Sequence, residues 1–340
     1  MNLLTVSNFE MRFSKVGYPT EFRQTERSSV NLLVINSGRG TYDVGKFTDL
    51  AHLLGPEHVL VFNDSLTVRS SFIGYNAESR SLVRFNLGYT RRGLMAEMRG
   101  DTANLGAGSR VRLVDGSWIQ LEQRREDFPR YWIISVSPGF DLELIRKSGE
   151  YITYGHMPAK FSDEIYTWVY ATRPGSVEYP SASRPFTPEL IDRLRKRGVG
   201  IETVTLHCNL ASLDASEFSP SKSLLEEHFE VTEQVARSLN SAVDEGRKII
   251  AVGTSAVRAM ESSCTGSGFR RSNGFTDLFI RPGRRLHLDG IITGMHDPTT
   301  SHLLMLGAFS DLSLIRSAYQ TAEEYGFMWH EFGDSCLIFS

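Results

Sequence analysis

Cysteine, long hydrophobic runs and an excess of one charge are all scarce or missing in this 340-residue chain. The three cysteines, Cys208, Cys264 and Cys336, are odd in number, far apart and in no metal-ligand spacing, which predicts reduced, mostly packed thiols. No run of 18 apolar residues occurs, which excludes a membrane-spanning helix. The formal net charge of −3 excludes a global electrostatic attraction to nucleic acid.

Repeats, low-complexity tracts and a secretory leader are also missing. The first residues, Met-Asn-Leu-Leu-Thr-Val, contain no basic segment followed by an apolar core. We therefore expect a cytoplasmic protein with no membrane partner. Its oligomeric state is expected to be either a monomer or a weak homo-oligomer. With 41% hydrophobic residues, the chain has enough apolar content for two domains with their own cores.

Residues 247–263 form the segment around which the rest is organised. Residues 249–252 are a short apolar run typical of a buried strand, and residues 256–261 favour a helix. Between them, Gly253, Thr254 and Ser255 break the strand and lead into the helix N-terminus. Backbone N–H groups and the positive end of a helix dipole bind anions at such a turn. An ordinary connection between a strand and a helix has the same pattern.

Residues 72–136 differ from the remainder of the chain. Short alternating runs separated by Gly, Asp and Pro turns predict a small antiparallel barrel or sandwich. Residues 78–130 contain ten arginines, no lysine and seven acidic residues, a local net charge of +3. This composition fits an RNA-facing surface, although a solvated β surface has the same signature.

The flanking segments alternate strands with helices. Strands are predicted at residues 31–36, 58–62, 201–207, 277–280, 291–293 and 335–339, and helices at 47–54, at 300–309, at 312–325 and after the N-caps Thr187 and Thr232. The fold class is therefore α/β, a mainly parallel sheet with helices on both faces, plus an inserted small antiparallel β-barrel. We expect residues 1–71 and 148–340 to form the α/β catalytic domain and residues 72–147 the barrel domain.

Polar residues at the predicted carboxyl ends of the strands should converge on one crevice. These residues are Asn63, Asp64, Thr205, His207, Gly253, Thr254, Ser255, Thr293, His296, Gly333 and Asp334. An acid or two, two histidines and several hydroxyls suit acid–base chemistry on a polar ligand. Each has a simpler interpretation: a packed histidine for His207, and turn-forming side chains for Asp64 and Asp334. Arg258 is either an anion clamp or a structural ion-pair partner.

The run Ala-Val-Gly-Thr-Ser-Ala-Val-Arg-Ala-Met-Glu-Ser at residues 251–262 resembles the signature of the S-adenosylmethionine:tRNA ribosyltransferase-isomerases of queuosine biosynthesis. Further similar segments follow in family order along nearly the whole chain. They are Phe-Thr-Asp-Leu at 47–50, Val-Phe-Asn-Asp-Ser at 61–65, Tyr-Thr-Trp-Val-Tyr-Ala at 166–171, Val-Thr-Leu-His at 204–207, Glu227 with Phe229 and Val231, His296 with Pro298, Leu-Leu-Met-Leu at 303–306, and Gly333 with Asp334.

The resemblance implies a barrel inserted into an α/β domain and an unusual use of S-adenosylmethionine as ribosyl donor, with no metal. The family transfers the ribosyl portion to an exocyclic amine of a 7-deazaguanine base in tRNA and releases adenine and methionine. A sulfonium acidifies the adjacent C5′ hydrogens, so a placed base starts the rearrangement. The implied catalytic residues are His207, Glu227 and Asp64. The implied substrate-binding residues are Thr205, Gly253, Thr254, Ser255, Arg258, Arg184, His296 and Asp334.

Four segments depart from the family pattern. Its Leu-His pair is replaced by Arg184 and Pro185, two glycines are missing from residues 208–213, a lysine is missing from residues 297–301, and an arginine is missing after Ser65. Lost basic residues are expected where a polyanion is no longer held. Three hypotheses therefore stay open: the parent tRNA-modifying enzyme, a divergent S-adenosylmethionine-using transferase with a small-molecule acceptor, and a non-catalytic nucleoside or RNA binder.

Overall fold

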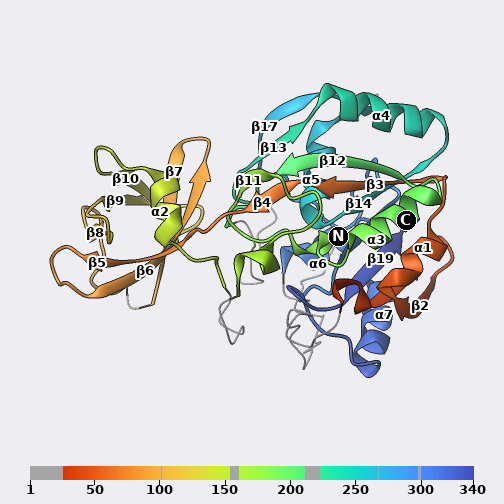
Figure 1. Cartoon of the computed structure of the whole chain (residues 1–340), viewed down its shortest axis with the longest axis horizontal. Helices are drawn as coiled ribbons and strands as arrows, with labels where there is room; N and C mark the ends of the chain where they lie inside the picture. Colours follow the sequence, from red (N-terminus) through yellow and green to blue (C-terminus); the bar gives the residue numbers. More distant parts are fainter. Residues whose placement is uncertain (1–25, 101, 154–160, 211–222, 267, 298–299) are drawn as a thin grey trace.

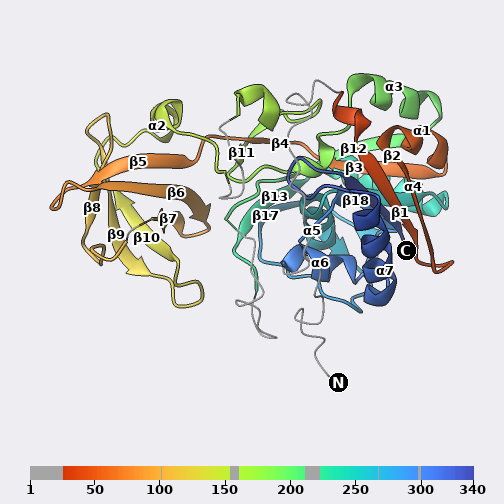
Figure 2. The ribbon, with the colours of Figure 1, turned by 90° about the horizontal axis from the view of Figure 1, so that it is seen from below.

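The computed structural model describes residues 26–100, 102–153, 161–210, 223–266, 268–297 and 300–340. It consists of a large sheet covered by helices and a separate β-barrel beside it (Figures 1 and 2). None of the helices in these residues is long and apolar enough to cross a membrane.

The large sheet contains nine strands. Their spatial order is β17 (Ser272–Thr276), β13 (Glu227–Val231), β12 (Gly200–Leu206), β3 (His58–Asn63), β14 (Lys248–Val252), β18 (Gly290–Gly294), β19 (Ser335–Phe339), β1 (Asn31–Asn36) and β2 (Thr41–Lys46). The pairs β12–β3, β3–β14, β14–β18 and β19–β1 are parallel, and the other four are antiparallel. The sheet is therefore mixed, with a parallel centre.

Helices cover both faces of this sheet, as the alternating pattern predicted (Figure 2). All six residues of β3 are buried, and the apolar run of β14 is buried after its first residue, because both strands have a core on either side. One core contains residues of α4 (Glu233–Asp244), α5 (Thr254–Ser263), α6 (Ser301–Leu306) and α7 (Leu312–Glu324). The opposite core contains residues of α1 (Leu50–Leu53) and α3 (Pro188–Lys196).

The predicted helix starts agree with the capping geometry. The Thr187 hydroxyl accepts the Leu190 N–H at 3.3 Å, and the Thr232 hydroxyl accepts the Val235 N–H at 3.3 Å. In α5, by contrast, eight of the ten residues are buried, so this helix runs through the core. The described residues also contain four short 3-10 helices: η3 (Arg27–Ser29), η4 (Phe47–Asp49), η5 (Asp163–Tyr166) and η6 (Ser181–Ser183).

The inserted barrel is closed and wholly antiparallel, and it confirms the interpretation of the alternating runs. Its strands, in order around the barrel, are β10 (Tyr131–Val136), β7 (Gly93–Arg99), β6 (Leu82–Thr90), β5 (Ser71–Asn76), β8 (Arg110–Arg112) and β9 (Trp118–Arg124). An apolar core of its own fills it, and Leu142 at the start of α2 (Leu142–Ser148) packs against that core. A parallel pair, β4 (Ser65–Thr67) with β11 (Arg173–Ser176), lies where the chain passes between barrel and sheet (Figure 1).

The strand predicted at residues 277–280 is wrong. These residues are a loop, and the strand ends at Thr276. The apolar side chain of Ile280 is buried all the same, because the loop packs into the core. Its backbone is held by a side chain instead of a neighbouring strand: Arg258 Nε donates to the Leu278 carbonyl at 3.0 Å. A minor two-stranded hairpin, β15 (Cys264–Thr265) with β16 (Gly268–Phe269), follows α5.

Candidate functional site

A pocket lies at the carboxyl ends of β12, β14 and β18, where the strand order predicted one. It encloses about 790 Å³ of space, including space open to solvent. Its walls comprise Glu178, Tyr179, Pro180, Ser181, Ala182, Cys208, Leu224, Glu227, Gly253, Thr254, Ser255, Arg258, Phe279, Thr293, His296, Ser301, His302, Met305 and His330. Six of the residues predicted as catalytic or substrate-binding are in this set, namely Glu227, Gly253, Thr254, Ser255, Arg258 and His296, together with Thr293 from the predicted strand ends.

The turn from β14 to α5 forms one wall of the pocket. Gly253 adopts φ +91°, a conformation that favours glycine, and a Cβ there would lie 3.2 Å from the Ala182 Cβ. The turn is fixed from behind, because Asn63 at the end of β3 donates from Nδ2 to Ser255 Oγ at 3.0 Å and to the Leu206 carbonyl at 2.8 Å. The N-terminus of α5 is therefore held open toward the pocket and suits an anionic group.

Arg258 and Glu227 form a buried ion pair at the pocket wall. Both side chains are almost fully buried, at 6% and 4% exposure. Burial lowers the pKa of Arg258 to about 10, so the guanidinium is charged at neutral pH. The same guanidinium also donates to the Leu278 carbonyl and, at 3.3 Å, to the Thr276 carbonyl. Arg258 thus closes the loop after β17 and neutralises Glu227, while Glu227 Oε1 accepts the Asn209 N–H at 2.7 Å.

Three histidines line the opposite wall. The rings of His296 and His302 stack with centroids 4.7 Å apart, and His330 is 4.9 Å from His296. Burial and the two neighbouring histidines hold the pKa of His296 well below 6.5, and burial and Arg258 lower the pKa of His302 to about 4. His296 bonds to Thr293 at 2.6 Å and His330 bonds to Ser181 at 2.7 Å. Neither ring nitrogen of His302 has a hydrogen-bond partner in the described part of the chain.

His207, Asp64 and Thr205 lie in a neighbouring polar network, outside the pocket wall. Thr205 Oγ1 donates to Asp64 Oδ1 at 2.7 Å and accepts from Arg173 at 2.7 Å. His207 Nδ1 bonds to Ser65 Oγ at 2.7 Å. Burial, His228 and Arg173 lower the pKa of His207 to about 4, and burial raises the pKa of Asp64. The imidazole is therefore neutral at physiological pH and able to accept a proton.

Two further predicted substrate-binding residues are buried behind the pocket. Both carboxylate oxygens of Asp334 accept backbone N–H groups, of Asn31 and Met328, at 2.7 Å each. Arg184 is 2% exposed and its guanidinium lies 5.4 Å from the ring centroid of Phe332. Asp334 therefore fixes the start of β1 to the segment before β19, while Arg184 has its charge buried beside an aromatic ring.

Several wall residues were not predicted from the sequence, among them Glu178, Ser181, His302 and His330. One signal was available: His302 follows His296 by six residues at the start of a predicted helix. Met305, which the residue pattern favours as core, is 3% exposed and also lines the pocket. Of the segments that depart from the family pattern, residues 211–213 and 298–299 lie outside the described residues.

Glu331 is a buried carboxyl behind the pocket, and its pKa is shifted oppositely to those of the histidines. Burial and the negative charge of Glu178 raise it to about 8, against the opposing effect of Arg184. Between pH 4.5 and 8 the folded protein therefore holds a proton that the unfolded chain has lost. Between pH 4 and 6.5 the unfolded chain instead holds a proton on each of His207 and His302 that the folded protein lacks. The combined effect of Glu331, His207 and His302 should make the free energy of unfolding highest near pH 6.5.

We expect Glu331→Gln to change the pH profile of stability. Below pH 6.5 the wild-type unfolding free energy falls as pH falls, because the unfolded chain takes up the histidine protons. Above pH 6.5 it falls as pH rises, by up to about 1.4 kcal/mol per pH unit, because folding must keep Glu331 protonated. The neutral glutamine removes this second dependence. Urea unfolding between pH 6 and 8 measures it; parallel profiles for the two proteins would show that Glu331 ionises freely.

Comparison with known proteins gives a match along the whole chain. A family described as queuosine biosynthesis protein matches residues 16–338. The S-adenosylmethionine:tRNA ribosyltransferase-isomerase of Ralstonia nicotianae is 30% identical, with 99% of this chain and 96% of the relative covered. The protein of the same name from Thermus thermophilus is 32% identical over 85% of this chain and 86% of the relative.

A solved structure has the same fold. The S-adenosylmethionine tRNA ribosyltransferase of Thermotoga maritima aligns with a TM-score of 0.55 and 22% identity, covering 97% of this chain and 99% of the other.

Proposed function

The chain belongs to the family of queuosine biosynthesis proteins, and we propose that it is a cytoplasmic S-adenosylmethionine:tRNA ribosyltransferase-isomerase. In this reaction the ribosyl unit of S-adenosylmethionine is joined to the aminomethyl group of a 7-deazaguanine in tRNA, and adenine and methionine are released. The observation that carries the proposal is the strand-end pocket, whose wall contains the signature turn of the family.

The charges of the pocket suit S-adenosylmethionine. Two of the wall histidines, His296 and His302, have lowered pKa values and are neutral at pH 7, and Arg258 is paired with Glu227. The Glu178 carboxylate also lines the wall, and a carboxylate there attracts a sulfonium cation. The amino-acid carboxylate of the ligand fits the N-terminus of α5, where Thr254 and Ser255 add hydroxyl donors.

We assign proton abstraction next to the sulfonium to His302. Its imidazole is neutral, it lines the pocket, and its ring nitrogens are not engaged by other described residues. Glu227 is a weaker candidate, because its carboxylate is bound to Arg258 and to the Asn209 N–H. His207 is also neutral at pH 7, but it bonds to Ser65 outside the wall, so it is the alternative base.

The barrel offers a surface for the tRNA acceptor. Several of its arginines lie over aromatic rings, including Arg110 over Trp118 at 4.5 Å and Arg124 over Trp132 at 4.7 Å. The rings hold these guanidinium groups in place, and the groups supply positive charge that binds phosphates. The turn between β6 and β7 carries Arg91 and the exposed Arg92 near the main sheet. A polyanion could therefore span the barrel and the mouth of the α/β domain.

Exchanging Arg91 and Arg92 for glutamate should weaken tRNA binding and reduce its salt dependence. Each lost phosphate contact lowers the slope of log affinity against log salt by about 1. Filter binding or fluorescence anisotropy at several salt concentrations measures this slope. The control is Arg237→Glu, an exposed arginine of α4 whose loss should leave both quantities unchanged. Equal slopes for all three proteins would remove this turn from the RNA surface.

The function is tested by measuring adenine and methionine release from S-adenosylmethionine. We expect release that requires tRNA carrying the 7-aminomethyl-7-deazaguanine base. Release without tRNA, stimulated by a small amine, would instead favour the divergent small-molecule transferase. Failure of the purified protein to release either product, with and without modified tRNA, would leave only the non-catalytic binder.

A further inference from the structure

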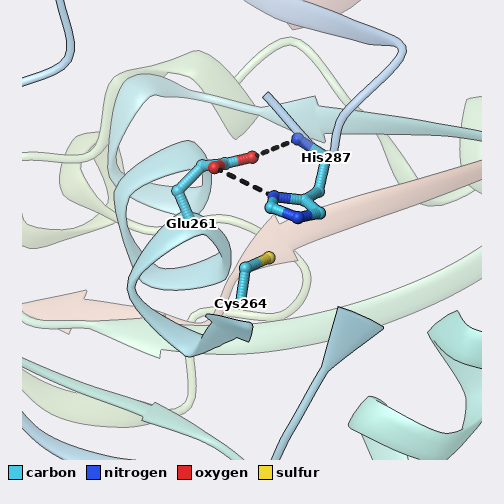
Figure 3. Close-up of side chains that lie close together, drawn as sticks. All are labelled: Glu261, Cys264 and His287. Atoms are coloured by element: carbon cyan, nitrogen blue, oxygen red, sulfur yellow. Dashed lines mark hydrogen bonds and ion pairs between the residues drawn. The ribbon is translucent and has the colours of Figure 1, made fainter. Parts of the chain in front are cut away.

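A second cluster of ligating side chains lies at the opposite end of α5 from the pocket. Glu261 is in the last turn of this helix, Cys264 follows it in β15, and His287 comes from the loop before β18. Figure 3 shows the three side chains converging on one space. One ligand atom from each lies within 4.8 Å of the other two. We propose that Glu261, Cys264 and His287 form a binding site for one Zn²⁺ ion.

The geometry fits a tetrahedral zinc ion. Nitrogen and oxygen ligands on tetrahedral zinc are about 3.4 Å apart, given bond lengths of about 2.1 Å. His287 Nδ1 and Glu261 Oε2 are 3.4 Å apart, which is long for a hydrogen bond between them. A thiolate on zinc lies about 3.6 Å from its neighbours, so the cluster would need to contract by roughly 1 Å at most.

The surroundings of Glu261 hold its carboxylate in place and leave the negative charge available to a metal ion. Glu261 Oε1 accepts the backbone N–H of His287 at 2.7 Å, which orients Oε2 toward the imidazole. The Glu261 side chain is 1% exposed, and within the described residues its one partner in an ion pair is His287. A buried carboxylate without a Lys or Arg partner is costly unless a cation or proton compensates it.

The ligand set selects the class of metal. A thiolate is a soft donor and an imidazole a borderline one, and together they suit Zn²⁺ better than Mg²⁺ or Ca²⁺; zinc also accepts a carboxylate ligand. The His287 side chain is 43% exposed, so a fourth position is open to water. Because α5 rises about 1.5 Å per residue, the cluster lies about 15 Å from Gly253 and forms a separate site. Zinc there would tie the end of α5 to the loop before β18.

Zinc binding is tested on the full chain, independently of the proposed function. Protein stripped with a chelator is loaded with Zn²⁺, desalted and analysed by mass spectrometry for metal. We expect one zinc per chain and a higher Tm with zinc. Cys264→Ser and His287→Asn should each lower zinc affinity by more than about 100-fold. The matched controls Cys208→Ser and His52→Asn, which change residues outside the cluster, should retain one zinc.

A cobalt titration gives a second measurement that needs no variant. One equivalent of Co²⁺ should produce a thiolate-to-cobalt charge-transfer absorption in the wild-type protein. The proposal is overturned if this band is missing at saturation, or if Cys264→Ser and His287→Asn hold zinc as tightly as the controls. It stands if the band appears at one equivalent and the two cluster variants lose zinc affinity while the controls keep it.

Discussion

Replacing His302 with asparagine is expected to lower adenine release by about 10²- to 10⁴-fold, the usual contribution of a general base. Asparagine retains polarity and similar size but cannot accept the C5′ proton. His302 makes a ring stack with His296 and no hydrogen bond to another described residue. Its loss should therefore change Tm little. Single-turnover adenine release, measured together with thermal unfolding, separates the chemical effect from a folding defect.

His207→Ala is the matched comparison for this result. If His302 is the base, His207→Ala should affect the rate less than His302→Asn, while losing the hydrogen bond to Ser65. His52→Asn, an exposed histidine of α1, should have no effect. If His302→Asn is fully active while His207→Ala is folded but inactive, the base is His207, beside the network around Asp64, and not His302.

Arg258→Met is expected to destabilise the protein by about 3–5 kcal/mol, because it leaves the buried Glu227 carboxylate without its partner. Two backbone carbonyls, of Leu278 and Thr276, also lose their donor. In the double variant Glu227→Gln/Arg258→Met the uncompensated charge is gone, so its cost should be smaller than the sum of the two single costs. Urea unfolding of the four proteins gives this coupling directly.

The control for Arg258 is Arg237→Met. Arg237 is also a helical arginine paired with a glutamate, but its side chain is 77% exposed and that of Glu233 is 52% exposed. An exposed pair contributes at most about 1 kcal/mol. A loss of under 1 kcal/mol for Arg258→Met as well would mean that the buried pair does not hold the loop after β17.

Much of the fold could be predicted because it depends on local patterns. The apolar run before Gly253, the Thr187 and Thr232 caps and the alternating runs of the barrel each determine their element through short-range chemistry. The loop at residues 277–280 could not be predicted, since Leu278 has the side chain of a strand residue while its carbonyl is bonded to Arg258 from another element. Strand β13, which begins at Glu227 and alternates polar and apolar residues, was not predicted either.

The site was predictable where it follows the sheet and unpredictable where loops complete it. Gly253, Thr254 and Ser255 follow a buried strand, so their position at the pocket could be inferred. His330 and Glu178 come from irregular segments, and no periodicity relates them to the strand ends. The zinc cluster was missed for a similar reason: the spacing of the cysteines carries no signal, because two of the three ligands are a glutamate and a distant histidine.

The most direct measurement is a crystal structure of the protein with S-adenosylmethionine bound. We expect its density in the strand-end pocket, with the carboxylate within hydrogen-bond distance of the backbone N–H groups at residues 254 and 255 and C5′ facing His302. Ligand density at another place on the molecule, with this pocket containing only solvent, would disprove the assignment of the pocket as the ribosyl-donor site.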